Sequence, residues 1–403
     1  MENKPKITAA QRRLLFGAVF LMATSSIGPA FLTQTTVFTQ QFMASFAFAI
    51  LASIVIDIGA QLNIWRVLSV SGKRGQDVAN EVFPGLGSLV AILIVIGGFA
   101  FNIGNVAGAG LGFNAIFGWD VRVGAAITGI FAIIIFLIKN GRAVMDVVTQ
   151  VLGVLMIGIV AYVMIISEPP VAEAAKRVIL PEDPIAMLLP IITLVGGTVG
   201  GYITFAGAHR LIEAGMTGEK NLRFVSHAAN WGILTTGVMR VLLFLAVLGV
   251  LTQGAVLSDE NPPASVFQFA LGDIGMRVFG VVLLAAALSS VIGAAYTSAS
   301  FMRSFNQVFD RYNNIVIVVF IATSTLIFLF VGRPVTLLIL AGSFNGLILP
   351  LTLGAILLAS RKKSIVGNYH HPTWMIVFGV IAVVVTLIAG FMSLQGLAEL
   401  WNG

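Results

Sequence analysis

The chain is short of charged residues and contains no cysteine. Only 10% of its 403 residues are Asp, Glu, Lys or Arg, whereas a soluble domain carries about 25%. The lack of cysteine excludes disulfides and thiolate metal sites, and it leaves the redox compartment unread. The sequence also lacks a nucleotide-binding loop, a pair of catalytic carboxylates and a metal-protease helix motif, so we do not expect an enzyme.

Apolar residues dominate instead, at 58% of the chain with a mean hydropathy of +0.99. The first apolar run is too long for the core of a cleaved signal peptide. A bilayer-spanning helix needs about 20 apolar residues, and the sequence predicts eleven such segments in an all-α membrane protein. They lie near residues 13–40, 43–65, 85–117, 121–138, 144–167, 185–212, 224–252, 274–305, 314–332, 334–359 and 373–395.

Lys and Arg are unevenly divided between the two sides of this predicted bundle. The N-terminal segment and every second connection together carry sixteen of them, and the opposite connections carry four. Because cytoplasmic loops are enriched in Lys and Arg, we expect a multi-pass protein of the cell membrane with a cytoplasmic N-terminus and an external C-terminus. The net charge of +6 lies in these short loops, so nucleic-acid binding is not expected. We expect a monomer in the lipid bilayer.

A glycine-rich stretch interrupts the sixth segment. Residues 195–210 read VGGTVGGYITFAGAHR, with four glycines inside six positions, and each glycine costs a helix interior about 1 kcal/mol relative to alanine. A span breaks at membrane depth only where its backbone faces protein, water or a ligand. We therefore expect a helix that stops near Val195, runs extended and restarts near Tyr202. The alternative is that the glycines let two helices pack closely.

The first segment has its own weak point at residues 25–29, Ser-Ser-Ile-Gly-Pro, where Pro29 removes a helical hydrogen bond. The two interrupted segments are five helices apart, an odd number, so the second half enters the membrane with opposite topology. This pattern is typical of LeuT-type transporters, which have an inverted five-plus-five repeat with broken helices 1 and 6. We expect one transporter domain over 1–403, with repeats near 13–167 and 185–359 and an extra helix near 373–395.

Four motifs link the chain to a known family. They are GPAFL at residues 28–32, IGNVAGAGLGFNAIFG at 103–118, VGGTV at 195–199 and LLAAALSSVIG at 283–293. With these motifs the chain resembles, over nearly its whole length, the NRAMP (natural resistance-associated macrophage protein) family of proton-coupled divalent metal transporters. The resemblance implies the LeuT-type fold and secondary transport.

The chain departs from this family at the residues that hold the metal. The resemblance places the family's metal-binding Asp-Pro-Gly-Asn on residues 39–42 and its Met-Pro-His on residues 200–202, which here read Thr-Gln-Gln-Phe and Gly-Gly-Tyr. An acidic pair on the third helix becomes Asn102 and Asn105, and a glutamine on the tenth helix becomes Gly342. No carboxylate or thioether remains where the family binds a bare ion.

What remains at the expected site is neutral and, because side chains are lost to glycine, wider. Hydroxyls and amides do not supply the charge that a hard cation requires. The N-terminal amides of a helix restarting at Tyr202 favour an anion, and Arg210 is able to pair with a carboxylate. The predicted substrate-binding residues are Thr33, Gln34, Thr35, Thr36, Thr39, Gln40, Thr198, Gly200, Gly201, Tyr202, Thr204 and Arg210.

A substrate that brings its own carboxylates fits such a site. We expect an importer of a small organic acid such as citrate, carried as a complex with Mg²⁺, Ca²⁺ or Mn²⁺. The metal is then part of the substrate, with no direct protein ligand and no cofactor. One alternative is transport of bare Mn²⁺ or Mg²⁺, and a second is transport of another small organic solute with Na⁺. A membrane sensor that kept the fold and lost transport is a third.

Ionisable residues inside a span are functional candidates. Asp57 is predicted to be a proton or cation site or a partner of Arg240, and the alternative is a structural hydrogen bond to a neighbouring helix. His209, Asn102 and Asn105 complete the predicted coupling path, and the resemblance implies proton coupling. Sodium coupling is the alternative, and its candidate hydroxyls, which otherwise join helices, are Ser289, Ser290, Thr297 and Ser298.

Overall fold

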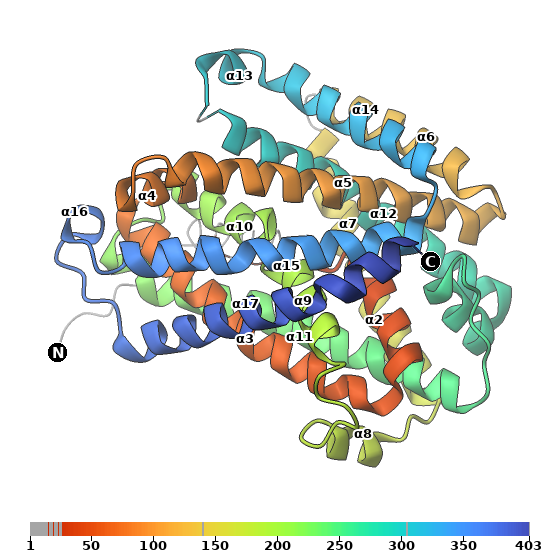
Figure 1. Ribbon diagram of the computed structural model, residues 1–403. Coiled ribbons are helices and arrows are strands. Elements are labelled where there is room, and N and C mark those ends of the chain that lie inside the picture. Colours follow the sequence, from red (N-terminus) through yellow and green to blue (C-terminus); the bar gives the residue numbers. More distant parts are fainter. Residues whose placement is uncertain are drawn as a thin grey trace, which may run out of the picture.

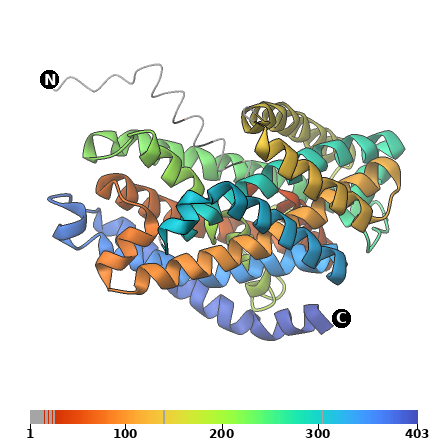
Figure 2. The ribbon, with the colours of Figure 1, turned by 90° about the horizontal axis from the view of Figure 1, so that it is seen from above.

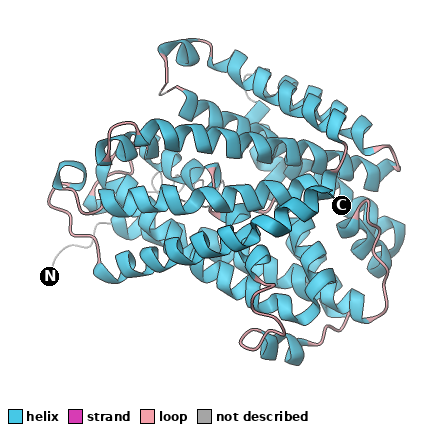
Figure 3. Cartoon of the chain, in the orientation of Figure 1, coloured by secondary structure: helices cyan, strands magenta, loops and turns pink. Residues whose placement is uncertain are grey.

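The computed structural model describes residues 15, 19, 23, 26–138, 141–303 and 305–402, and in these residues the chain is helical with no strand (Figure 3). The helices are α2 (Pro29–Phe42), α3 (Phe46–Ser71), α4 (Gly75–Val82), α5 (Leu86–Phe117), α6 (Val121–Leu137), α7 (Gly141–Ile166), α8 (Val171–Arg177), α9 (Leu188–Thr198), α10 (Tyr202–Glu213), α11 (Leu222–Thr252), α12 (Pro262–Met302), α13 (Gln307–Arg311), α14 (Asn313–Val331), α15 (Pro334–Ala359), α16 (Lys363–Val366) and α17 (Thr373–Asn402), with single 3₁₀ turns η1 (Met43–Ser45) and η2 (Glu219–Asn221).

Eight helical stretches of the described chain are long and apolar enough to cross a membrane. One of them joins α2, η1 and α3, and another joins α9 and α10. Helices α7 and α8 together form a ninth candidate, bent by 107° between Ile166 and Val171. The predicted all-α, multi-pass membrane fold is confirmed, whereas the count of eleven spans and the two repeats stay predictions.

The long helices run roughly side by side, with α5 and α12 packed against each other near the middle (Figures 1 and 2). Helices α6 and α14 pack against α5 on one side, while α17 lies along α15 on the outside of the bundle (Figure 1). Glycines allow the close approach of α5 and α12. A Cβ on Gly280 would lie 2.9 Å from the carbonyl oxygen of Gly112, tighter than side chains tolerate, so small residues are needed at this crossing.

The first interruption lies at Ile27 and Gly28, inside the predicted weak point, of which Ser25 falls outside the described residues. Ser26 is helical, Gly28 is extended (φ −101°, ψ −172°), and Pro29 opens α2. Proline suits the first position of a helix because the missing N–H has no intrahelical partner there. The break is confirmed, with Pro29 starting the second half-helix.

The second interruption separates α9 from α10 at residues 199–201, so α9 ends three residues later than Val195. Gly201 adopts φ 54° and ψ −130°, a conformation that favours glycine, and a Cβ on it would overlap the side chain of Asn345. A Cβ on Gly196 would overlap the backbone of α15 at Gly342. The glycines therefore make the break and also let two helices pack closely.

Polar contacts tie together the end of the bundle where α4 and α16 lie (Figure 1). Lys362 donates to the carbonyl oxygens of Glu81 and Val82 at the end of α4. Ser69 of α3 donates to the carbonyl of Met216 over 2.9 Å. The connections after α3, α10 and α15 thus meet at one end, in agreement with the alternation of charged loops.

A chain of hydrogen bonds joins α3 to the start of α17. Arg66 Nε donates to the Tyr369 hydroxyl (3.0 Å), which lies 3.1 Å from Nδ1 of His371. Nε2 of His371 lies 2.8 Å from Oδ1 of Asn63, whose Nδ2 donates to the Met375 carbonyl. Because Oδ1 only accepts, Nε2 carries the proton and Nδ1 accepts from Tyr369. Burial, and next the charge of Arg66, lower the pKa of His371 to about 4.

Candidate substrate site at the helix breaks

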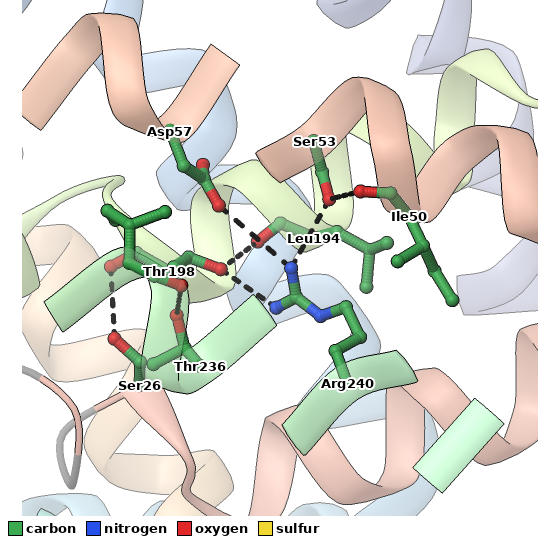
Figure 4. Close-up of polar contacts among 9 residues, drawn as sticks. Ser26, Ile50, Ser53, Asp57, Leu194, Thr198, Thr236 and Arg240 are labelled. Atoms are coloured by element: carbon green, nitrogen blue, oxygen red, sulfur yellow. Dashed lines mark hydrogen bonds and ion pairs between the residues drawn. The ribbon is translucent and has the colours of Figure 1, made fainter. Parts of the chain in front are cut away.

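Arg240 of α11 brings a positive charge to the two breaks. Its side chain is 1% exposed, and its Nη2 donates a 2.8 Å hydrogen bond to Oγ1 of Thr198, the last residue of α9 (Figure 4). Its guanidinium carbon lies 4.8 Å from the ring centroid of Phe31, in the first turn of α2. The charge therefore sits where both interrupted helices meet, and the ring beneath it adds a cation–π attraction.

Thr198 links the two breaks to each other. Its carbonyl oxygen accepts a 3.2 Å hydrogen bond from Oγ of Ser26, immediately before the first break. Its hydroxyl donates to the carbonyl of Leu194 over 2.8 Å while it accepts from Arg240 (Figure 4). A movement of either break therefore changes the surroundings of Arg240.

Asp57 of α3 faces Arg240, the partner predicted as one of its possible roles. The distance from Asp57 Oδ2 to Arg240 Nη1 is 3.9 Å, and both side chains are 1% exposed (Figure 4). Arg240 Nη1 also donates to Ser53 Oγ over 3.3 Å. The hydroxyl of Thr198 also lies close to Asp57, but it donates its proton to the Leu194 carbonyl, and neither carboxylate oxygen of Asp57 has a hydrogen-bond partner among the described residues.

Gln34 of α2 fills the centre of the predicted site. Its Nε2 donates a 2.7 Å hydrogen bond to the carbonyl of Leu338 in α15. A Cβ on Gly342 would overlap this amide, and a Cβ on Gly197 would lie 3.0 Å from its Oε1, which has no hydrogen-bond partner. The expectation of a cavity widened by glycine is therefore wrong in this conformation, because the amide of Gln34 occupies the room that the glycines leave.

Two further polar side chains adjoin the second break. The phenol of Tyr202, the first residue of α10, lies close to the side chain of Asn105 of α5, whose Nδ2 has no hydrogen-bond partner among the described residues. Asn345 of α15 donates to the Gly97 carbonyl over 3.0 Å, and its unpartnered Oδ1 lies beside Gly201. Sequence reasoning missed Asn345, although an asparagine in the middle of an apolar span is a signal of the kind that singled out Asp57.

The predicted threonines are brought together but differ in what they offer. Thr33, Thr35, Thr36, Thr39 and Thr204 are all buried. The hydroxyls of Thr36 and Thr39 donate to carbonyls of their own helix, at Leu32 and Thr35. The hydroxyls of Thr35 and Thr204 have no hydrogen-bond partner among the described residues. The hydroxyls of Thr35 and Thr204 therefore keep a free donor, whereas those of Thr36 and Thr39 are able only to accept a further hydrogen bond.

Four predicted residues lie away from the breaks. Gln40 and Arg210 are exposed, so they do not belong to the buried site, since each points out of its helix toward the surface. His209 is buried, but its Nε2 accepts a 3.1 Å hydrogen bond from the backbone N–H of Gly75 at the start of α4. Asn102 donates to Ser324 of α14 over 2.8 Å, which joins two helices and separates it from Asn105.

The placement of the family's Asp-Pro-Gly-Asn on residues 39–42 is also corrected. These residues form the regular last turn of α2, and the chain leaves the helix only at Met43, with φ 47°. Because the motif marks a helix break, its counterpart here is the interruption at Gly28, followed by Pro29. Gly28 then stands in the place of the aspartate and Phe31 in the place of the asparagine, directly below Arg240.

An apolar cavity of about 240 Å³ adjoins the first break. Its walls include Ile27 at the break, Leu32 of α2, Met239 of α11, Ile157 of α7 and Val282 of α12. The cavity is thus bounded almost entirely by hydrocarbon, and Arg240 is not among its lining residues. An apolar group of a solute has room there.

The hydroxyls considered for Na⁺ lie on α12. Those of Ser290 and Ser298 lack a hydrogen-bond partner among the described residues, and Ser298 lies against Gly98 of α5. No three His, Asp or Glu side chains gather as a metal site in the described part of the chain. The sodium alternative stays a prediction.

Comparisons with known proteins agree with this architecture. A model described as natural resistance-associated macrophage protein-like (Nramp) matches residues 19–395. The chain is 50% identical to a membrane protein named YcsG from Bacillus subtilis (strain 168), over 100% of each chain. It is 24% identical to the divalent metal cation transporter MntH of Erwinia tasmaniensis, over 73% of this chain and 72% of that relative.

Among solved structures, a crystal structure of the Eremococcus coleocola manganese transporter superposes with a TM-score of 0.79. The alignment covers 99% of this chain and 90% of the other, at 17% sequence identity. At that identity the likeness shows the fold alone. The buried guanidinium and its neighbours must therefore be interpreted from their own chemistry.

Proposed function

The chain belongs to the natural resistance-associated macrophage protein-like family, and on that premise we propose that it imports small organic acids, carried as complexes with a divalent metal ion such as metal citrate. The family and its named relatives place the chain among membrane transporters and not among enzymes. We further propose proton coupling, a cytoplasmic N-terminus and a monomer.

The observation that supports an anionic solute is the buried charge of Arg240 at the breaks. A bare divalent cation 4 Å from a guanidinium meets a repulsion of about 8 kcal/mol at an effective dielectric constant of 20. A carboxylate at the same distance, such as Asp57, offsets that repulsion in full, whereas one at about twice the distance offsets half of it, so the pair disfavours a bare cation where the solute lies nearer to Arg240 than to Asp57. A solute carboxylate in the same place is instead attracted, and the planar fork of arginine matches its geometry.

Uptake by the purified protein in proteoliposomes tests this proposal. We expect accumulation of radiolabelled citrate that rises when Mg²⁺ or Mn²⁺ is added, and a loss of at least about tenfold in the Arg240→Met variant. Arg210→Met, which changes an exposed arginine, is the matched control and is expected to keep uptake. A panel of monocarboxylates and dicarboxylates in the same assay defines the size of the acid.

Transport of bare Mn²⁺ is the second candidate, favoured by the divalent metal cation transporter among the relatives. It requires Mn²⁺ uptake without any organic acid. If that uptake is found and Arg240→Met leaves it intact or raises it, the organic-acid proposal is wrong.

A further inference from the structure

Arg240 is held in place without using its full hydrogen-bonding capacity. A guanidinium has five N–H groups. The structure gives Arg240 one hydrogen bond to Thr198 and one to Ser53, while its Nε has no partner among the described residues. Buried donors are normally paired. The side chain is therefore fixed by two hydroxyls and still able to bind a further acceptor.

Asp57 balances the charge of Arg240 but does not hydrogen-bond to it. The 3.9 Å separation is a charge contact, and both carboxylate oxygens are buried and unpartnered. Breaking a well-bonded buried ion pair is costly, since it leaves a charge alone. For a pair without hydrogen bonds, less free energy is lost when another carboxylate replaces Asp57 beside Arg240, provided that Asp57 does not stay charged.

Arg240 is the charged side chain placed against Asp57. Of the helices packed on α3, α9, α15 and the described side chains of α17 contain no Asp, Glu, His, Lys or Arg. On α10, His209 turns toward the backbone of Gly75 and Arg210 is exposed. The cations of α8, α11, α16 and η2 other than Arg240 are exposed or paired with acids, and Arg66 of α3 itself is bound to Tyr369 and Ser226. No other described cation is therefore in position to take over as the partner of Asp57.

Building on the proposed function, we propose that Arg240 binds a carboxylate of the solute in exchange for Asp57, and that Asp57 takes up a proton in the same step. As the solute arrives, Asp57 takes a proton from the water on the side of entry and an O–H bond forms; as the solute leaves, this bond breaks and the proton is released to the water on the other side. The cluster is neutral before binding, with Arg⁺ and Asp⁻, and neutral afterwards, with Arg⁺, a solute carboxylate and protonated Asp57.

The same exchange connects binding to the helix breaks. Arg240 is anchored to Thr198, whose carbonyl holds Ser26 on the other side of the first break. A carboxylate that draws the guanidinium away from Asp57 therefore pulls on both breaks together. About one proton should cross with each carboxylate bound at Arg240, and further carboxylates of a polyacid are then neutralised by the metal ion.

Proton uptake on binding tests the exchange without a variant. Titration calorimetry of wild-type protein with citrate, with and without Mg²⁺, in two buffers of different ionisation enthalpy gives the number of protons taken up. We expect about one proton per solute bound. Binding without proton uptake would overturn the exchange and leave the proposed function standing, whereas no binding or uptake of any acid tested would overturn the proposed function.

The Asp57→Asn variant separates coupling from transport. We expect it to exchange labelled for unlabelled acid across the membrane, but to lose accumulation driven by an inward proton gradient, because an amide cannot take up the proton. Asp310→Asn, an exposed acid paired with Arg303, is the matched control and should keep gradient-driven accumulation. Proton-driven accumulation by Asp57→Asn would contradict the exchange. If this variant does not fold, the calorimetric proton count decides alone.

Discussion

The side chains of Arg240 and Gln34 determine the charge and the free space at the centre of this protein. The guanidinium lies above Phe31 at the first break, and the amide of Gln34 fills the space beside Gly342. The roles of these two residues were partly predictable from the sequence. Arg240 and Asp57 are ionisable groups within apolar spans, which marks them as functional candidates. The filling of the cavity by Gln34 depends on a side-chain position that composition does not determine.

The alignment of the first break shows why motif matching misplaced a ligand position. A Gly-Pro pair before an apolar run either interrupts a helix or starts one, and the same letters fit two registers of the family pattern. Only the helical geometry of residues 39–42 decides between them. The exposed positions of Gln40 and Arg210 likewise follow from which face of a helix is buried, which short half-helices do not reveal in sequence.

Gly201 tests the conformational demand at the second break. Its φ of 54° and the overlap of any Cβ with Asn345 predict that Gly201→Ala lowers stability by about 1–3 kcal/mol and reduces uptake. Gly293→Ala, in α12 with nothing within 4 Å of its Cβ, is the control and should gain up to about 1 kcal/mol. Thermal unfolding in detergent measures both. Equal changes in melting temperature for the two variants would contradict backbone strain at Gly201.

His371 should make stability depend on pH. Its pKa falls from 6.5 to about 4 in the folded protein, so the unfolded chain binds the proton first as the solution is acidified. Stability present at neutral pH is therefore lost as the pH falls from 6.5 toward 4. His371→Gln should flatten this part of the melting-temperature profile, while His370→Gln, at an exposed position, should not. An unchanged slope in His371→Gln would rule out this histidine as the cause.

At the scale of elements, α2, α9 and α15 are held together by close contacts between glycine and polar side chains. Thr193 and Ser343 hydroxyls lie 2.6 Å apart between α9 and α15, and Gln34 joins α2 to α15. Both breaks could be predicted from the sequence, because glycine and proline within apolar runs weaken or interrupt the helical backbone. It did not predict which helices face each other across them, since that depends on long-range packing.

Gly342→Ala tests this packing. The added methyl overlaps Gln34 and approaches the Thr193 carbonyl at 2.8 Å, so we expect a loss of about 1–3 kcal/mol from overpacking. Adding Gln34→Ala should recover part of that loss, because the two side chains compete for one space. Gly354→Ala, on the same helix with open space around its Cβ, should be tolerated. Strict additivity of the two changes would show that Gln34 and Gly342 do not compete.

At the scale of the whole molecule, the two ends of the bundle differ in charge and contacts. The connections after α3 and α15 meet through Lys362 and the end of α4. The opposite end carries the acidic loop before α12, with Asp259 and Glu260. Composition alone predicted a membrane protein, because a soluble protein of this length would not carry so many long segments that are poor in charged residues.

The natural absence of cysteine allows a direct test of orientation. Lys220→Cys and Asp259→Cys introduce single thiols at exposed positions on opposite connections. A membrane-impermeant maleimide should label Asp259→Cys in intact cells and Lys220→Cys only after permeabilisation. The reverse pattern would invert the proposed topology.

The uncharged side chain at the centre has an electrical consequence. With Gln34 packed between α9 and α15 and the neighbouring hydroxyls buried, and with the charge of Arg240 balanced by Asp57, the resting protein leaves little room for a continuous file of water. We therefore expect this conformation not to conduct ions, and a planar bilayer that contains the protein should carry no standing current at any voltage. The Gln34→Gly variant should therefore show a measurable current across the same bilayer.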